Sequence, residues 1–139
     1  MPGDGSADEV WRAMAAVVFD NRDAWRRDVI ETTGLPFSRV RVLRRLAKRP
    51  MTAKEIAKAA TMDAPATTVA VNNLEDRGLV VREAHPTNRR CKVVSLTEEG
   101  RRVVAIIDGV DDPAPRPFAA LSPAELKTLE SILAKLASG

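Results

Sequence analysis

The chain has 139 residues and a net charge of +3, and its length suits one compact domain or one domain with an oligomerisation arm. Hydrophobic residues make up 45% of the sequence and charged residues 29%, which excludes a chain that is disordered by composition. The longest apolar run, residues 13–19, is too short to span a bilayer, and the acidic residues 1–9 do not resemble a signal peptide. We therefore expect no membrane partner.

A single cysteine and a single histidine exclude an internal disulfide and a structural zinc site. We expect no metal, no cofactor and a reducing, cytoplasmic setting. The sequence also lacks a glycine-rich phosphate loop and any pairing of nucleophile with base, so we expect no catalytic residues and no enzyme.

The basic residues are concentrated in the middle of the chain. Residues 38–102 hold fifteen Lys and Arg residues against seven Asp and Glu residues, whereas the two ends together hold seven against twelve. A basic centre between acidic ends indicates that the centre binds a polyanion. The alternative is a solvated surface with scattered arginines. Which of these two interpretations holds depends on the type of secondary structure that carries the basic residues.

Residues 8–33 are predicted to form one long N-terminal helix. The segment contains no Gly or Pro, and its apolar residues recur about every 3.6 positions. Trp11 and Trp25 both lie on it, and such a large apolar surface on a terminal element indicates a partner chain. The alternative is ordinary packing on the same chain. Gly34 ends the helix, and a second helix is predicted over residues 36–49.

Two short, capped helices then predict a helix-turn-helix. Thr52 and Glu55 form a capping box at the start of the first helix. Asp63 is the predicted N-cap of the second helix, Pro65 fits its first turn, and Gly78 follows its last turn. The spacing of the second helix predicts four buried positions, Thr67, Ala70, Val71 and Leu74.

A β-hairpin with a basic tip is predicted next. Apolar strands over residues 79–83 and 91–96 flank a polar loop that contains turn-forming residues and the pair Arg89 and Arg90. Such a hairpin is a wing, and its tip can enter the minor groove of DNA. Cys91 lies beside these basic residues, which raises the hypothesis of a thiol that senses oxidants. The alternative is a small residue in a strand.

Two further helices are predicted to complete the chain. Thr97 caps a strongly apolar helix that should end in the proline-rich residues 111–117. Ser122 and Glu125 form a capping box for a last apolar helix that ends near residue 138.

The second helix of the helix-turn-helix can lie in the major groove of DNA. The residues predicted to point away from the core follow by elimination from the buried set: Ala64, Pro65, Ala66, Thr68, Val69, Asn72 and Asn73. Thr68 can bond a phosphate or a base edge, Val69 and the alanines can touch thymine methyl groups, and the asparagines suit adenine.

This face carries no Lys or Arg before Arg77, so the affinity for the DNA backbone must come from other residues. The candidates lie in the wing and on the flanking helices: Arg89, Arg90, Lys92 and Lys54, with Arg39 and Lys58 as further candidates.

Together these segments resemble the MarR family of winged-helix bacterial transcriptional regulators. The resemblance rests on Leu-Glu-x-x-Gly-Leu-Val-x-Arg at residues 74–82, the wing at residues 86–90 and Leu-Thr-x-x-Gly at residues 96–100, and it spans nearly the whole chain. It implies a mainly α fold with a small β wing, in which a winged helix-turn-helix over residues 38–100 is flanked by dimerisation helices. The N-terminal dimerisation helix would occupy residues 1–37 and the C-terminal ones residues 101–139, in one structural domain overall.

The resemblance further implies a homodimer that binds double-stranded, pseudo-palindromic operator DNA, usually as a repressor. It also implies release by a small aromatic effector bound between the dimer and DNA-binding regions, although no residue of the sequence identifies the ligand site. The main alternative is a winged-helix protein-interaction module without sequence-specific DNA binding, whose apolar terminal helices bind other proteins.

The sequence departs from the family pattern at two places. Family wings often carry Asp where this chain has Asn88, and without that carboxylate the wing should be looser or more positive. The penultimate helix of the family is usually long, but the prolines of residues 113–117 exclude that here, so the dimerisation helices should be bent or shortened.

Overall fold

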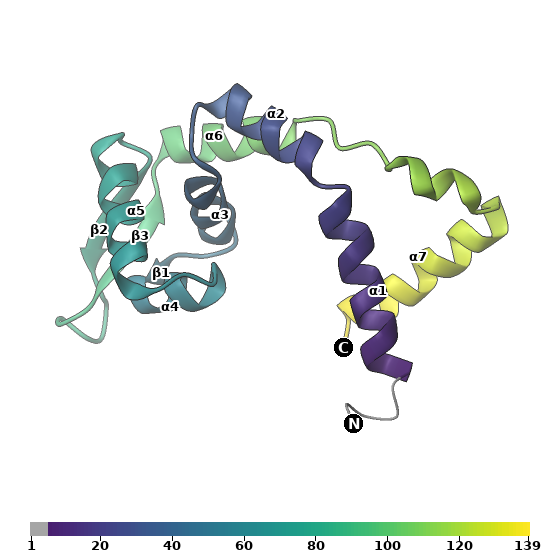
Figure 1. Ribbon diagram of the computed structural model, residues 1–139. Coiled ribbons are helices and arrows are strands. Elements are labelled where there is room, and N and C mark those ends of the chain that lie inside the picture. Colours follow the sequence, from purple (N-terminus) through teal and green to yellow (C-terminus); the bar gives the residue numbers. More distant parts are fainter. Residues whose placement is uncertain (1–5) are drawn as a thin grey trace.

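The computed structural model describes residues 6–139; residues 1–5, which belong to the segment expected not to be a signal peptide, lie outside this range. The elements in chain order are α1 (Ser6–Asp20), α2 (Asp23–Thr33), α3 (Phe37–Leu46), β1 (Met51–Thr52), α4 (Ala53–Ala59), α5 (Ala64–Asp76), β2 (Val80–Ala84), β3 (Lys92–Leu96), α6 (Glu98–Asp108), the 3₁₀ helix η1 (Arg116–Ala120) and α7 (Pro123–Ala137). The fold is mainly helical with a small sheet, as predicted. Figure 1 shows α3–α5 and the sheet in one lobe, with α1 and α7 apart from it. Within residues 6–139, no helix is long and apolar enough to cross a membrane.

The N-terminal segment forms two helices, so the prediction of one long helix over residues 8–33 is wrong. At the break, Asn21 donates through its side-chain Nδ2 to the carbonyl oxygen of Val17 at 2.7 Å. Its backbone amide donates to the carbonyl oxygen of Val18 at 3.2 Å. Asparagine competes for backbone acceptors in this way and favours helix ends, a signal that apolar periodicity does not contain.

The caps of the helix-turn-helix lie where the sequence predicted them. Thr52 Oγ1 accepts from the Glu55 amide at 3.2 Å, and Glu55 Oε1 accepts from the Thr52 amide at 3.0 Å. At the start of α5, Asp63 Oδ1 accepts from the Ala66 amide at 2.7 Å. Beyond α5, Gly78 has a φ of +76°, which favours glycine. The four predicted core positions of α5 are buried: Thr67, Ala70, Val71 and Leu74.

The sheet contains one strand more than the sequence predicted. Its order is β1-β3-β2, and both pairs are antiparallel. Strands β2 and β3 form the predicted hairpin with bounds shifted by one residue, and Val94 and Leu96 turn into the core. Strand β1 is only two residues long, with Met51 opposite Val94, and a pair of residues is too short to show an alternating pattern.

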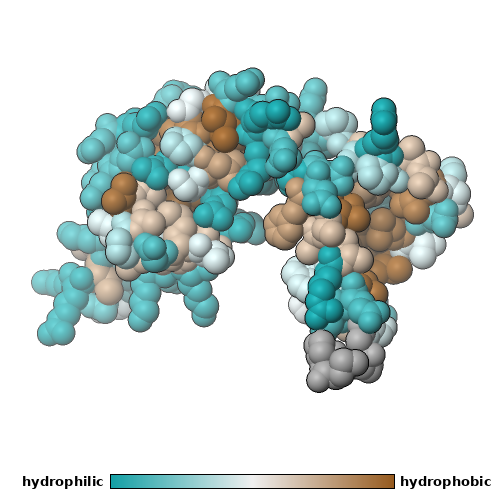
Figure 2. Space-filling model, in the orientation of Figure 1, coloured by the Kyte–Doolittle hydropathy of each residue, from teal (hydrophilic) through white to brown (hydrophobic). Residues whose placement is uncertain are grey.

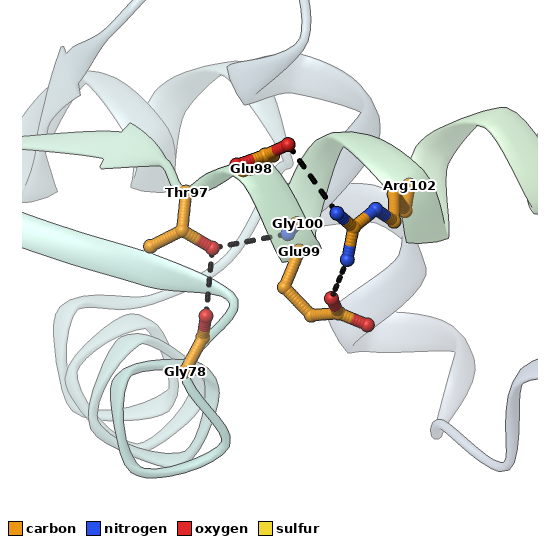
Figure 3. A network of polar contacts seen from close by, with 6 residues as sticks. All are labelled: Gly78, Thr97, Glu98, Glu99, Gly100 and Arg102. Atoms are coloured by element: carbon orange, nitrogen blue, oxygen red, sulfur yellow. Dashed lines mark hydrogen bonds and ion pairs between the residues drawn. The ribbon is translucent and has the colours of Figure 1, made fainter.

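The turn between α5 and β2 is joined to the start of α6 (Figure 3). Thr97 Oγ1 donates to the Gly78 carbonyl oxygen at 2.6 Å and accepts from the Gly100 amide at 3.0 Å. A Cβ on Gly100 would lie 2.1 Å from the carbonyl oxygen of Leu79, so this close approach requires glycine. This joint gives a structural role to the glycines of the two sequence motifs, Gly78 in residues 74–82 and Gly100 in residues 96–100.

The hydrophobic core lies between the sheet and helices α2–α6, and it includes Trp25, Leu43, Ile56, Leu74 and Ile107. In contrast, no residue of α1, η1 or α7 in the described chain is buried. Large apolar side chains on these helices are exposed, among them Trp11 at 68% and Leu136 at 61%. The terminal helices therefore leave apolar surface without a covering partner in this chain.

The C-terminal part is interrupted, as its prolines predicted. α6 ends at Asp108, and residues 111–115 form no helix before η1 and α7 follow. We call residues 111–115 the linker. Asp112 of the linker accepts from the Arg22 guanidinium at 2.5 Å, which ties the linker to the break between α1 and α2.

Candidate nucleic-acid interface

Helix α5 presents an exposed face opposite its buried one. The residues predicted to point away from the core are exposed, except for the half-buried Asn73: Ala64, Pro65, Ala66, Thr68, Val69 and Asn72. Val69 is 58% exposed although it is apolar, and an isolated apolar side chain among small residues suits contact with a thymine methyl group. Thr68 Oγ1 donates to the Ala64 carbonyl oxygen at 3.1 Å, so its hydroxyl oxygen is left to accept.

The two asparagines of α5 are not free side chains. Asn72 Oδ1 accepts from Arg82 Nη2 at 2.6 Å, and Asn73 Oδ1 accepts from Arg39 Nε at 3.4 Å. The sequence predicts both asparagines on the outer face but does not indicate their arginine partners. The position of Arg82 in the strand that follows α5 is the signal that could have indicated the contact.

The wing carries its positive charge at the tip. Arg89, Arg90 and Lys92 are exposed, and none of them makes an ion pair within residues 6–139. The tip projects as a hydrophilic extension of the lobe, below and to the left in Figure 2. Charges that are free of intramolecular carboxylates are available to phosphates.

The wing loop is held by its own hydrogen bonds. His85 Nδ1 accepts from the amides of Thr87 and Asn88, both at 3.1 Å, and Asn88 Oδ1 accepts from the Arg90 amide at 3.1 Å. Asn88 thus orders the backbone rather than pairing with an arginine side chain. Of the two expectations for this departure from the family pattern, the loop geometry favours a more positive wing over a looser one.

The flanking basic residues differ in their availability. Lys54 and Lys58 of α4 are exposed. Arg39 of α3 is half-buried and donates to both Asn73 and Ser38, so it is part of the packing behind α5. Lys54 and Lys58 are therefore the better candidates for phosphate contacts.

A separate cavity of about 290 Å³ opens where the end of α1 meets α2 and α3. It is lined by three aromatic or apolar groups of α1 and α2, one aromatic ring of α3 and five arginines: Val18, Phe19, Trp25, Phe37, Arg22, Arg26, Arg41, Arg44 and Arg45. The sequence does not indicate this cavity, because its residues come from three helices that no motif links.

The cavity combines aromatic rings with positive charge. Trp25 and Phe37 meet edge to face with ring centroids 5.6 Å apart. The guanidinium of Arg22 lies 3.9 Å from the Trp25 centroid, and that of Arg26 lies 4.4 Å from the Phe37 centroid. Arg41 Nε is buried and has no hydrogen-bond partner within the described chain. Arg41 itself lines the cavity, where its guanidinium can pair with an anion.

The helix-turn-helix, the antiparallel hairpin that follows it and the exposed face of α5 define a winged helix-turn-helix protein. The model of the MarR family matches residues 33–90. The chain is 31% identical over 112 residues to a putative transcriptional regulatory protein for the hcr operon of Thauera aromatica, covering 79% of this chain and 68% of that protein. The chain belongs to the MarR family.

Two further similarities agree with this assignment. The uncharacterised HTH-type transcriptional regulator YwhA of Bacillus subtilis is 36% identical over 94 residues, which cover 62% of this chain and 63% of that protein. The solved structure of Sco3205, a MarR family transcriptional regulator from Streptomyces coelicolor in complex with DNA, is 29% identical. The similarity covers 95% of this chain and 86% of that one, with a TM-score of 0.61. The chain is a transcriptional regulator of this family and not an enzyme.

Proposed function

We propose that the protein is a sequence-specific DNA-binding repressor that acts as a homodimer and is released from its operator by a small aromatic effector. The observation that supports DNA recognition is the exposed face of α5 beside a wing in which Arg89, Arg90 and Lys92 have no carboxylate partner within residues 6–139. In this arrangement α5 is the recognition helix and lies in the major groove. The wing and Lys54 hold the phosphates, and the protein works in the cytoplasm, where the DNA is.

In this proposal, DNA binding and dimerisation belong to different segments of the chain, which share one hydrophobic core. Residues 38–100 supply DNA binding, residues 1–37 supply the N-terminal dimerisation helix, and residues 101–139 supply the C-terminal ones. Trp25 of α2 and Ile107 of α6 are buried together with residues of α3 and α5, which supports a single structural domain in which these boundaries are functional.

The support for a homodimer is the uncovered apolar surface of α1 and α7. Figure 2 shows hydrophobic residues gathered over this part of the molecule. Exposed apolar surface of this kind marks an interaction site, and a second copy would bury the same surface on both chains. Dimeric recognition places the two half-sites about 10 base pairs apart.

A binding experiment tests the DNA proposal against the interaction-module alternative. The purified protein is titrated with duplexes from the promoter region of its neighbouring genes and with scrambled duplexes of the same composition. A regulator binds a promoter duplex at least about a thousandfold more tightly than the scrambled ones at physiological salt. Equal binding of both sets, or no binding, would leave the protein-interaction module as the function.

The arginine-lined cavity supports an effector that is both aromatic and anionic. Its rings can stack on an aromatic ligand, and the guanidinium of Arg41, which lines the cavity, can pair with a carboxylate. A Trp11→Phe variant leaves Trp25 as the single fluorophore, so benzoate and its neutral analogue benzamide can be compared by titration. Benzoate should change Trp25 emission, and Arg41→Met should weaken its binding about tenfold. Equal responses to benzamide and benzoate would remove the anionic assignment.

A further inference from the structure

Arg82 of β2 lies against the recognition helix and joins two of its side chains. Its Nη1 donates to Glu75 Oε1 at 2.6 Å, and its Nη2 donates to Asn72 Oδ1 at 2.6 Å. Asn72 and Glu75 are three positions apart, so they share one face of the helix. The Arg82 side chain is 28% exposed, so it lies largely against the protein.

The backbone of Arg82 is well placed to hold this contact. Arg82 is opposite Val94 in the antiparallel pair of β2 and β3, and Val80, two residues earlier in the same strand, is buried. The anchor of the guanidinium therefore belongs to the sheet, whereas its two acceptors belong to the helix. A planar guanidinium that bonds two groups at once fixes their geometry more strongly than a single contact would.

The chemistry of arginine determines which end of Asn72 faces the DNA. A guanidinium has donors and no acceptor, so it can bond only to the carbonyl oxygen of the amide. The bond to Arg82 turns Oδ1 towards the arginine and occupies one of its two lone pairs, so the amide group of Asn72 without a partner in this contact is Nδ2, which can only donate. An asparagine that reads adenine through two bonds needs its oxygen to accept from adenine N6.

We propose that Arg82 is a positioning residue that sets base preference by holding the oxygen of Asn72, so that Asn72 presents its donor to the major groove. Asn72 then favours base edges that accept, namely guanine N7 and O6, adenine N7 or thymine O4, over paired contact with adenine. This proposal rests on the proposed function, because it requires α5 in the major groove. It offers an alternative to the sequence-based expectation that Asn72 pairs with adenine as both donor and acceptor.

The first test compares base preference in the wild type and in Arg82→Lys. Lysine keeps the positive charge near Glu75 but lacks the fork that reaches both partners. Each protein selects from a pool of randomised DNA duplexes, and its affinity is then measured for the selected duplex and for single-base-pair changes in it. The wild type should discriminate about tenfold at one position in each half-site in favour of an accepting edge. In Arg82→Lys this preference should fall to about twofold or move towards paired contact with adenine, with all other positions unchanged.

A second variant separates the two ends of Asn72. Asn72→Asp still offers an oxygen to Arg82 but removes the outward donors. The preference for accepting edges should therefore be lost in this variant, although the contact with Arg82 is retained. Undiminished preference in Asn72→Asp would contradict the proposal.

A double-mutant cycle tests whether Arg82 acts through Asn72. In an Asn72→Ala background, Arg82→Lys should leave base preference unchanged, since the side chain that it positions is absent. The same loss of preference in both backgrounds would overturn the proposal, because Arg82 would then contact DNA directly. Arg77→Lys, a matched change at an exposed arginine next to α5, is the control and should leave base preference unchanged. Circular dichroism and thermal unfolding verify that each variant folds.

The outcomes distinguish this proposal from the function on which it rests. A wild-type protein that selects no sequence from the pool would remove both. A wild-type protein that selects an operator, with Arg82→Lys preferring the same base at every position, would remove only the role of Arg82.

Discussion

Arg90 carries its charge at the tip of the wing without an ion-pair partner within residues 6–139. We expect Arg90→Ala to weaken DNA binding by a similar factor on every sequence, because a phosphate contact carries no sequence information. The slope of log affinity against log salt concentration should fall by about 0.9 for the lost contact.

Fluorescence anisotropy over a range of salt concentrations measures the effect of Arg90→Ala. Arg116→Ala, a matched change at an exposed arginine of η1 away from the winged lobe, is the control and should keep the wild-type slope (Figure 1). An Arg90→Ala protein with unchanged affinity and slope would show that the wing does not bind phosphates.

Glu55 makes stability depend on pH at the start of α4. The hydrogen bond from the Thr52 amide, and then that from the Arg49 guanidinium, hold the pKa of the Glu55 carboxyl below its ordinary value. The stabilisation is therefore present above the pKa of the unfolded chain and is lost as the pH falls through the lower folded-state pKa.

Glu55→Gln should remove this pH dependence, because glutamine keeps the capping geometry but does not ionise. Thermal unfolding from neutral pH to about pH 3 should show the Tm difference between wild type and variant closing in acid. Glu83→Gln changes an exposed glutamate whose side chain makes no hydrogen bond or ion pair in the described chain, and it should not alter the profile. A constant difference for Glu55→Gln at all pH values would contradict the assignment.

Single residues also show where sequence reasoning ends. The outward position of Asn72 follows from helical spacing, because the buried positions of α5 determine the exposed ones. Its bond to Arg82 does not follow, because the packing of strand β2 against α5 is a tertiary property. The same holds for Arg41 and Trp25. The sequence around each of them is compatible with an ordinary core or surface position, and the cavity forms only where α1, α2 and α3 meet.

At the scale of elements, the joint between α5, β2 and α6 depends on a position without a side chain. A Cβ on Gly100 would lie 2.1 Å from the carbonyl oxygen of Leu79. Gly100→Ala should therefore destabilise the fold by about 2 kcal/mol, since α6 must move away from the turn. Chemical denaturation measured by circular dichroism gives this value.

Gly109→Ala provides the control for Gly100→Ala. Gly109 has a φ of −84°, and a Cβ there would have its nearest contact at 3.4 Å, so alanine should change stability by at most about 0.5 kcal/mol. Equal effects of the two substitutions would show that the close approach at Gly100 does not determine stability.

Elements with strong local signals are those that the sequence predicted well. The capping boxes at Thr52 and Ser122 and the N-cap Asp63 lie at the starts of α4, α7 and α5 because capping is a local interaction. The break at Asn21 and the strand at Met51 were harder to predict. The break depends on the Asn21 side chain, which competes with the helix for a backbone acceptor. The strand depends on pairing with β3, which is distant in the sequence.

At the scale of the molecule, α1 and α7 should form the surface between two copies. Placing a carboxylate there, with Trp11→Asp on α1 or Leu136→Asp on α7, should give monomers at micromolar concentration. A monomer reaches one half-site at a time, so operator affinity should fall at least about a hundredfold. Light scattering and anisotropy measure the two effects.

Val69→Asp is the reciprocal control, since it changes an exposed apolar residue of the recognition helix instead. This variant should remain dimeric while losing DNA binding. A wild-type chain that is monomeric at micromolar concentration would refute the dimer.

The linker, residues 111–115, has a consequence for how far apart two recognition helices can be. Pro113 and Pro115 have a fixed φ and no amide hydrogen, so the linker cannot be absorbed into α6 when a partner binds. The distance that the linker can span is then set by its number of residues, because a partner cannot shorten the linker by extending α6. Inserting or deleting residues there should change which operator spacing a dimer tolerates, while the choice of bases within each half-site is preserved.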